Sequence, residues 1–202
     1  YGTAPGLAGA QIRFMPLRAD NEYLIDFDAI ENPDEVKLMY VSYPNNPTGA
    51  VAGDEFYEKL VRFAKEHDII VLHDNAYSEL VFDGEIGKSF LAYPGAKDVG
   101  IELNSFSKSY SMGGARLAVL CGNAELVQAY RKLLDMTDFC VFPAIQQAGI
   151  CALKEGKPFT EQVRGEYRRR RDFLLEEMDK AGWKIPVPKA TMFVWAPIPD
   201  SW

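Results

Sequence analysis

Short apolar runs of strand length alternate with helical patterns along most of this 202-residue chain. The runs that predict strands are 37–42, 69–73, 99–104 and 116–122, the last expected to be buried. A helical pattern between two strands predicts that the strands run parallel, because the helix carries the chain back to the starting edge of the sheet. We therefore expect an α/β fold, a mostly parallel sheet with helices on both faces.

Helical patterns fall at 54–66, 124–134, 143–154 and 159–181. In the first of these, the apolar residues Phe56, Leu60, Phe63 and Ala64 are spaced to cover one side of the sheet, and Asp54 is the expected N-cap. The last helix contains four consecutive arginines, Arg168–Arg171. Acidic residues at pairing distance favour a solvated or interdomain surface there over an anion site.

A domain boundary is expected at 155–158, where a glycine and a proline interrupt the helical patterns. Residues 1–156 would belong to a large domain, and 157–202 would begin a smaller α+β domain with strands at 183–185 and 191–196. The chain starts at Tyr1 without an initiator methionine and stops just after a strand pattern. We expect it to be a piece of a longer protein.

Charge and composition narrow the class of partner. A net charge of −7 without a sustained basic block disfavours nucleic acid and anionic membrane surfaces, and no apolar run is long enough to cross a bilayer. Cys121, Cys140 and Cys151 lie in apolar sequence and are expected to be reduced core residues in a cytoplasmic protein. His67 and His73 have no partner at metal-ligand spacing, so no metal site is predicted. Small molecules are the expected partners.

Three polar clusters each follow a strand run: 43–49, 74–77 and 105–108, with Arg116 eight residues beyond the last. Taken alone, each cluster has an ordinary structural explanation. Asn-Pro-Thr-Gly could be a rigid turn, Asp74 could cap the next turn, and Lys108 could be a surface lysine. The carboxyl ends of parallel strands, however, meet at the edge of the sheet where ligands bind. Because the three polar clusters occur in order at successive strand ends, they favour a binding site over three unrelated turns.

This combination resembles the class I and II aminotransferases, which are pyridoxal-phosphate enzymes of fold type I. The matching motifs are Asn46-Pro47-Thr48-Gly49, Asp74 followed by Tyr77, and Ser105-x-Ser107-Lys108 ending in Arg116. The likeness runs through nearly the whole chain, as far as 189–196. Within the family, 43–51, 73–82 and 94–100 are most similar to LL-diaminopimelate and aspartate-type aminotransferases.

The resemblance implies pyridoxal 5′-phosphate as the cofactor. Lys108 would hold it as a Schiff base and move a proton, and Asp74 would pair with its pyridine nitrogen. Tyr77 and Asn46 would donate hydrogen bonds to the phenolic oxygen of the ring.

The cofactor's phosphate would be held by Ser105, Ser107 and Arg116, although serines at a strand end often cap turns and an arginine beside a strand often pairs with a carboxylate. The chain departs from the family pattern Gly-x-Arg-x-Gly, because Ala118 occupies the last position. Three features of the family have no counterpart in this sequence. They are the upstream phosphate-binding turn, the aromatic residue that stacks on the cofactor ring, and the downstream arginine that binds the substrate carboxylate.

The implied activity is transamination between an amino acid and a 2-oxo acid, in a protein that is a homodimer when whole. Fold alone does not select the reaction, and two alternatives stay open. One is a pyridoxal-phosphate-dependent C–S β-lyase, and the other is a non-catalytic, aminotransferase-like effector domain of a regulator. Because substrate-gripping groups are missing, this chain alone is expected to be a poor catalyst.

Overall fold

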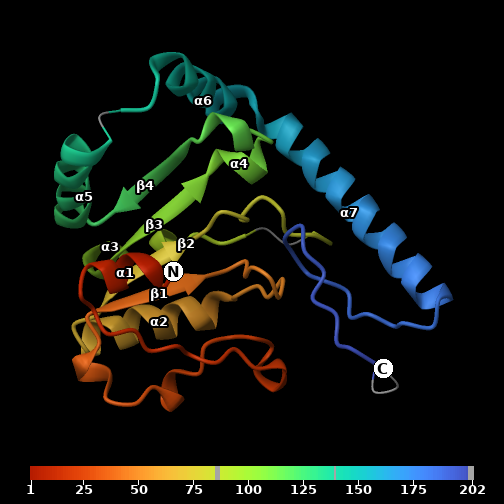
Figure 1. Ribbon diagram of the computed structural model, residues 1–202, viewed down its shortest axis with the longest axis horizontal. Coiled ribbons are helices and arrows are strands. Elements are labelled where there is room, and N and C mark those ends of the chain that lie inside the picture. The colour runs from red at the N-terminus through yellow and green to blue at the C-terminus, as the bar shows by residue number, and fades with distance from the viewer. Residues whose placement is uncertain (85–86, 139, 200–202) are drawn as a thin grey trace.

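A computed structural model describes residues 1–84, 87–138 and 140–199 of the chain. A sheet with the strand order β1-β2-β3-β4 lies at its centre (Figure 1). The strands are β1 Leu38–Ser42, β2 Ile70–Asp74, β3 Gly100–Ser105 and β4 Ala118–Gly122. The first three run parallel, and β4 is antiparallel to β3. The predicted α/β fold with a mostly parallel sheet is confirmed.

The long helices lie where their apolar periodicity predicts them. The α-helices are α1 Thr3–Leu7, α2 Asp54–Glu66, α3 Ala96–Val99, α4 Phe106–Ser109, α5 Ala124–Thr137, α6 Pro143–Glu155 and α7 Lys157–Lys180. Short 3-10 helices lie at η1 Ala19–Asn21, η2 Phe27–Ala29, η3 Pro33–Glu35, η4 Phe90–Ala92 and η5 Gly113–Ala115. Within the described ranges, none of the helices has both the length and the apolar character that crossing a bilayer demands.

The predicted N-cap of α2 is wrong by one residue. Gly53 occupies the cap position, without a side-chain hydrogen bond, and Asp54 is the first helical residue. The Asp54 carboxylate instead pairs with the Lys88 ammonium group and accepts a hydrogen bond from the Tyr93 hydroxyl. It therefore ties the start of α2 to the segment that precedes β3.

The main core lies between α2 and the first two strands. Tyr57, Leu60 and Ala64 of α2 are buried together with Val41 of β1 and Val71 of β2. Close-packed side chains of this kind leave the two strands little freedom to move, so the core fixes the positions of the carboxyl ends of β1 and β2.

The prediction of two strands after α7 is wrong. Residues 183–185 and 191–196 contain no strand in the structure, and the nearest pairing is an isolated bridge between Val81 and Ala190. The backbone amide of Phe82 also donates to the carbonyl of Lys189. An apolar alternation becomes a strand only where a neighbouring backbone can complete the ladder, and within the described residues only this short contact is made.

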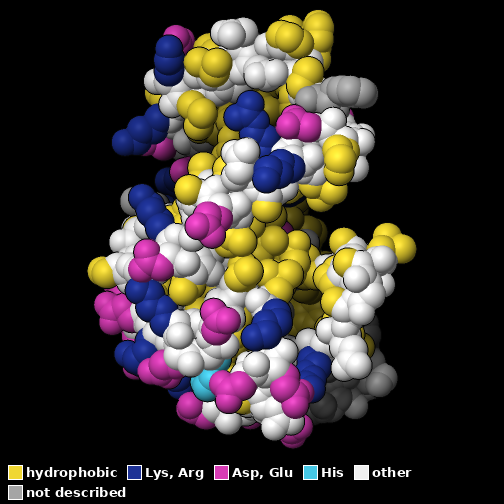
Figure 2. Space-filling model, turned by 90° about the vertical axis from the view of Figure 1, so that its left-hand side faces the viewer, with side chains coloured by type: hydrophobic (Ala, Val, Ile, Leu, Met, Phe, Trp, Pro, Cys, Tyr) yellow, Lys and Arg dark blue, Asp and Glu magenta, His cyan; other side chains and the backbone are white. Residues whose placement is uncertain are grey.

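The cysteines and the last strand are more exposed than predicted. Cys121, Cys140 and Cys151 are all exposed, and β4 is exposed along most of its length instead of buried. Large apolar side chains exposed on or near β4, α5 and α6 are Val119, Tyr130, Leu133, Met136, Phe142, Ile150 and Leu153. Figure 2, viewed from the side on which α5 lies, shows apolar atoms at the surface. No segment in the described part of the chain covers these apolar side chains, although their pattern predicted a core.

Arg171 attaches α7 to the loop that follows β2. Its Nη1 donates to Asp83 Oδ2 and to the carbonyl of Pro188, both at 2.9 Å, and its guanidinium lies 4.8 Å from the centroid of the Phe82 ring. Arg169 and Arg170 instead pair with Glu166, one turn away on the surface of α7. The arginine run thus divides between a solvated surface, as the charge pattern predicts for Arg169 and Arg170, and a buried contact of Arg171.

Replacing Arg171 by alanine is expected to lower the free energy of unfolding of the full-length protein by about 2 kcal/mol, because charge-assisted hydrogen bonds are lost and the Pro188 carbonyl loses its donor. Arg169→Ala is the matched control, because the Arg169 side chain is 70% exposed in a surface ion pair, and it should change the free energy of unfolding by less than about 0.5 kcal/mol. Urea unfolding measures both. Equal effects of the two substitutions would contradict the assignment of Arg171 as the attachment of α7.

Candidate functional site

Three of the residues predicted for the site gather around a fourth, Tyr77, at the carboxyl edge of the sheet. The Lys108 Nζ atom, at the start of α4, lies 5.4 Å from the centroid of that ring. The side chain of Asn46, from the loop after β1, hydrogen-bonds with the Tyr77 hydroxyl, and the charge of Asp74, at the end of β2, acts on the same group. Three consecutive strand ends therefore converge on one place, as the sequence predicts.

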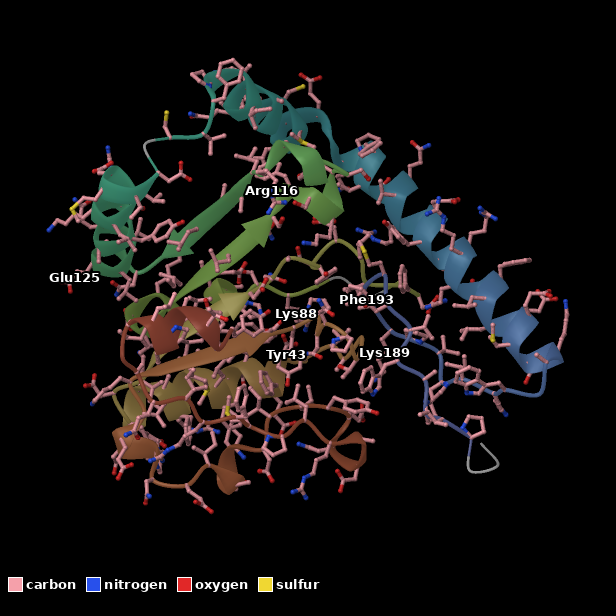
Figure 3. All side chains as sticks on the ribbon, viewed as in Figure 1. Tyr43, Lys88, Arg116, Glu125, Lys189 and Phe193 are labelled. Atoms are coloured by element: carbon pink, nitrogen blue, oxygen red, sulfur yellow. The ribbon has the colours of Figure 1, made fainter. Side chains whose placement is uncertain are left out.

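Electrostatics keep the Tyr77 hydroxyl protonated. Burial raises the pKa of Tyr77, the negative charge of Asp74 raises it further, and the hydrogen bond with Asn46 only partly opposes them. A phenol with a raised pKa remains a hydrogen-bond donor at neutral pH. Phe193, from the segment after α7, packs edge-on against this ring with the centroids 5.9 Å apart (Figure 3).

The Asp74 carboxylate is oriented through both of its oxygens. The backbone amide of Ala76 donates to Oδ1 at 3.2 Å, and the Tyr1 hydroxyl donates to Oδ2 at 2.7 Å. The Tyr1 ring stacks on Tyr40 of β1, with the centroids 4.7 Å apart. Tyr1 was not predicted as a site residue, and no spacing could have indicated it, because it precedes Asp74 by 73 positions.

The loop after β1 presents Asn46 from a hydrogen-bonded turn. Asn45, which is buried, donates to the carbonyl of Ser42 and accepts from the Thr48 hydroxyl at 2.7 Å. Gly49 ends the turn with φ of +72°, and a Cβ there would come within 3.0 Å of the Ala190 carbonyl oxygen. Only glycine suits this position, because both the dihedral angle and the space exclude a side chain.

Gly49→Ala is accordingly expected to destabilise the full-length protein by about 1–2 kcal/mol. Gly165→Ala is a control of opposite sign: Gly165 lies inside α7 with nothing within 4 Å of its Cβ position. Alanine there should stabilise the protein by about 0.5–1 kcal/mol through helix propensity. Thermal unfolding of both variants tests the pair, and a neutral Gly49→Ala would show that the turn tolerates a side chain.

The predicted phosphate residues lie around the start of α4. Ser105 is the N-cap of α4, and its Oγ accepts a hydrogen bond from the amide of Ser107 at 3.2 Å. Arg116 lies beside the end of β3, has a left-handed backbone with φ of +53°, and donates to the carbonyl of Gly113 (Figure 3). A non-glycine residue with this backbone is uncommon and often marks a functional site. Ala118, which replaces the family's glycine, is exposed and pairs with Ser105, so its methyl group is accommodated.

His73 and Glu102 form a buried contact beside the site that sequence reasoning missed. His73 was considered only as a metal ligand, and no group of three or more His, Cys, Asp or Glu in the described part of the chain could hold a metal ion. A usable signal was present, because both are polar residues inside apolar strand runs. A polar side chain in a buried strand needs a partner, and here each is the other's partner.

The donor set suits a planar, phosphorylated aldehyde. Lys108 offers a primary amine, Asp74 a carboxylate, and Tyr77 and Asn46 neutral donors, while Ser105 and Arg116 follow at the next turn. On this fold, such a set defines the pyridoxal-phosphate-dependent enzymes of fold type I.

The chain belongs to the class I and II aminotransferases, whose family model, described as "Aminotransferase class I and II", matches residues 1–201. It is 47% identical over 206 residues to an LL-diaminopimelate aminotransferase of Moorella thermoacetica, covering all of this chain and 52% of the relative. The solved structure of apo BacF from Bacillus subtilis is 42% identical, with a TM-score of 0.94 over 98% of this chain and 51% of that one.

A probable N-succinyldiaminopimelate aminotransferase from Thermus thermophilus is 33% identical, with a TM-score of 0.89 over 98% of this chain and 54% of the other. The chain spans about half the length of the curated relatives it matches. Family membership implies pyridoxal 5′-phosphate as the cofactor, in agreement with the prediction from the motifs.

Proposed function

We propose that the whole protein transfers the amino group between LL-diaminopimelate and a 2-oxo acid. The observation that carries the proposal is the position of the Lys108 amine over the Tyr77 ring, on which Asp74 and Asn46 also act. The substrate class is supported by the relatives, because those named LL-diaminopimelate aminotransferase are 42–47% identical to the entire chain.

The roles of the residues follow from their chemistry. Bound pyridoxal phosphate supplies an electron sink for the negative charge that develops when an amino acid loses its α proton. Lys108 would hold the cofactor covalently and, once free, would take and return the proton at the substrate α carbon. Asp74 would keep a proton on the pyridine nitrogen, and Tyr77 and Asn46 would donate to the phenolic oxygen.

The phosphate would be held at the turn between β3 and β4. Arg116 offers a forked, permanently charged donor, which suits a phosphate better than lysine does. The Ser105 hydroxyl accepts from the Ser107 amide, yet it keeps its own hydrogen to donate, and the Ser107 hydroxyl is a second donor.

The arrangement of the whole protein is part of the proposal. We propose that residues 1–156 belong to the large domain and that 157–202 begin the smaller one, which Arg171 joins to the loop after β2. The whole protein would be a cytoplasmic homodimer. The support is that the chain spans about half the length of the relatives it matches, so the remaining half or a partner subunit would supply the rest of the site.

The full-length protein, loaded with pyridoxal phosphate, tests the function. We expect glutamate to form from LL-diaminopimelate and 2-oxoglutarate, with kcat/KM at least about tenfold above that for aspartate, because a site built to hydrogen-bond the distal amino group of diaminopimelate rejects a shorter donor that lacks this group. Pyruvate and ammonia released from cystathionine without an oxo acid would instead favour the lyase. No turnover of any amino donor, with a DNA-binding segment in the full chain, would favour the effector domain.

A further inference from the structure

A buried histidine and a buried glutamate face each other across the second and third strands. His73 of β2 and Glu102 of β3 are register partners, and they are 0% and 8% exposed. The His73 Nδ1 atom lies 3.0 Å from Glu102 Oε2. Neither side chain has a role in the proposed reaction.

The other partners of Glu102 are all donors. Its Oε2 accepts from the Ser89 hydroxyl at 2.9 Å and from the Phe90 amide at 2.8 Å, and its Oε1 accepts from Asn75 Nδ2 at 3.1 Å. The Ser89 oxygen itself accepts from the Leu91 amide, so its hydrogen is directed to Glu102. A carboxyl group surrounded by donors in this way is stabilised in its ionised form.

The pKa of Glu102 agrees with this geometry. Burial alone would raise the pKa, but the hydrogen bond and charge of His73, with the hydrogen bonds from Asn75 and Ser89, outweigh burial and hold it below its usual range.

Both nitrogens of His73 face acceptors. Nε2 lies 3.0 Å from the backbone carbonyl oxygen of Tyr43, which can only accept, so Nε2 carries a hydrogen. The Tyr57 hydroxyl, from α2, lies 3.2 Å from the same nitrogen and can share that hydrogen. Because Nδ1 faces the Glu102 carboxylate, it carries a hydrogen as well. These contacts suit an imidazole ring that donates from both nitrogens, to the Glu102 carboxylate and to the Tyr43 carbonyl.

These contacts join the three strand ends that carry the site. Tyr43 directly follows β1 and opens the loop that holds Asn46. His73 immediately precedes Asp74, and Asn75, bonded to Glu102, immediately follows it. Glu102 lies on β3, which leads into the turn of Lys108. One buried ion pair thus contacts all three segments directly behind the site.

We propose that the His73–Glu102 ion pair is a positioning device, which fixes the strand ends that present Asn46, Asp74 and Lys108 to the cofactor. The proposal rests on the proposed function, because it assigns those three residues to the cofactor. A purely stabilising role explains the pair poorly, since apolar residues of similar volume often stabilise a core as well as a buried ion pair does. Directional bonds to three segments are what an apolar core cannot supply.

Glu102→Gln in the full-length protein tests the proposal, because it removes the charge and keeps the shape. We expect pyridoxal phosphate to bind the apo-protein about tenfold more weakly, at the lower end of what losing a group that orients a ligand residue costs. We also expect the pH midpoint of the visible absorbance of the bound cofactor to shift, and kcat to fall while KM for the amino donor changes less than about twofold.

The surface pair His67–Asp34 provides the matched control. Its carboxylate, like that of Glu102, contacts a histidine Nδ1, here at 2.6 Å, but the Asp34 side chain is 85% exposed. Asp34→Asn makes the same change of carboxylate to amide away from the site and should leave cofactor affinity within about twofold of the wild type.

A nitrogen NMR spectrum of the wild-type full-length protein at pH 7 tests the charge without any variant at the carboxylate. Both ring nitrogens of His73, assigned by the signals missing from His73→Gln, should be protonated. One bare nitrogen would overturn the ion pair, even if Glu102→Gln fails to fold. Glu102→Gln that binds cofactor as tightly as Asp34→Asn does would overturn the positioning role. Wild-type protein that binds no pyridoxal phosphate would instead contradict the proposed function.

Discussion

Lys108→Ala in the full-length protein is expected to remove the covalently bound form of the cofactor and to lower transamination by about 10⁴-fold or more. Two losses combine: the amine that would bond the cofactor is gone, and so is the group that would move the proton at the substrate α carbon. Positioned proton transfer alone contributes up to about 10⁴-fold, so the combined loss should be at least that large. The visible absorbance of the cofactor and the rate of a single amino transfer measure the two losses separately.

The matched control is Lys88→Ala. Lys88 is also a lysine near the carboxyl edge of the sheet, but it is exposed, and its ammonium group pairs with Asp54, at the start of α2. It should keep the absorbance band and a turnover within about twofold of the wild type, since an exposed ion pair contributes little. A Lys108→Ala variant that still transaminates at the wild-type rate would remove Lys108 from the reaction, whatever its effect on folding.

The parts of the fold that sequence predicted are those set by local patterns. Helix α2 occupies the predicted residues, because apolar residues at Phe56, Leu60 and Ala64 encode both its period and the side that packs on the sheet. Only its cap was misplaced, since the Asp54 carboxylate had a better partner in Lys88, which is far away in sequence. Local periodicity does not reveal such partners.

The predictions that failed are those of strands and buried residues, which depend on the neighbouring segments that pack against them. An apolar pattern says that a segment is suited to burial, and the neighbour that buries it is not part of that pattern. Residues 191–196 alternate like a strand, yet in the described part of the chain their backbone pairs with a neighbouring segment only through the Thr191 amide, which donates to the Leu80 carbonyl beside the Val81–Ala190 bridge. Cys121 and Cys151 lie on surfaces without cover among the described residues.

The site was more predictable than its surroundings. Asn46 and Lys108 follow a strand and Asp74 ends one, and parallel topology then brings strand ends together without any knowledge of side-chain contacts. The Tyr1–Asp74 and His73–Glu102 contacts depend on the register of the strands and on how a distant residue packs. Polar residues inside apolar runs are the one signal that would have indicated the second pair.

Asp74→Asn is expected to lower kcat by about 10²–10³-fold, while pyridoxal phosphate still binds through Lys108. The reason is electrostatic, because a carboxylate can hold a proton on the pyridine nitrogen and a neutral amide cannot, so charge in the transition state loses its stabilisation. Asparagine keeps an oxygen that can accept from the Ala76 amide, so the turn after β2 should survive. The loss should therefore appear in kcat, with KM for the amino donor little changed.

Asp98→Asn is the control for this substitution, because Asp98 pairs with Lys65 on the surface and its side chain is 70% exposed. It should leave kcat within about twofold of the wild type. We would measure steady-state rates and cofactor content on the same samples of the two variants. Together they separate the effect of losing the Asp74 charge from an effect on the structure of the site. If Asp74→Asn loses the cofactor in proportion to its activity, then Asp74 acts by ordering the turn through Ala76 and Tyr1, and its charge is not what the reaction needs.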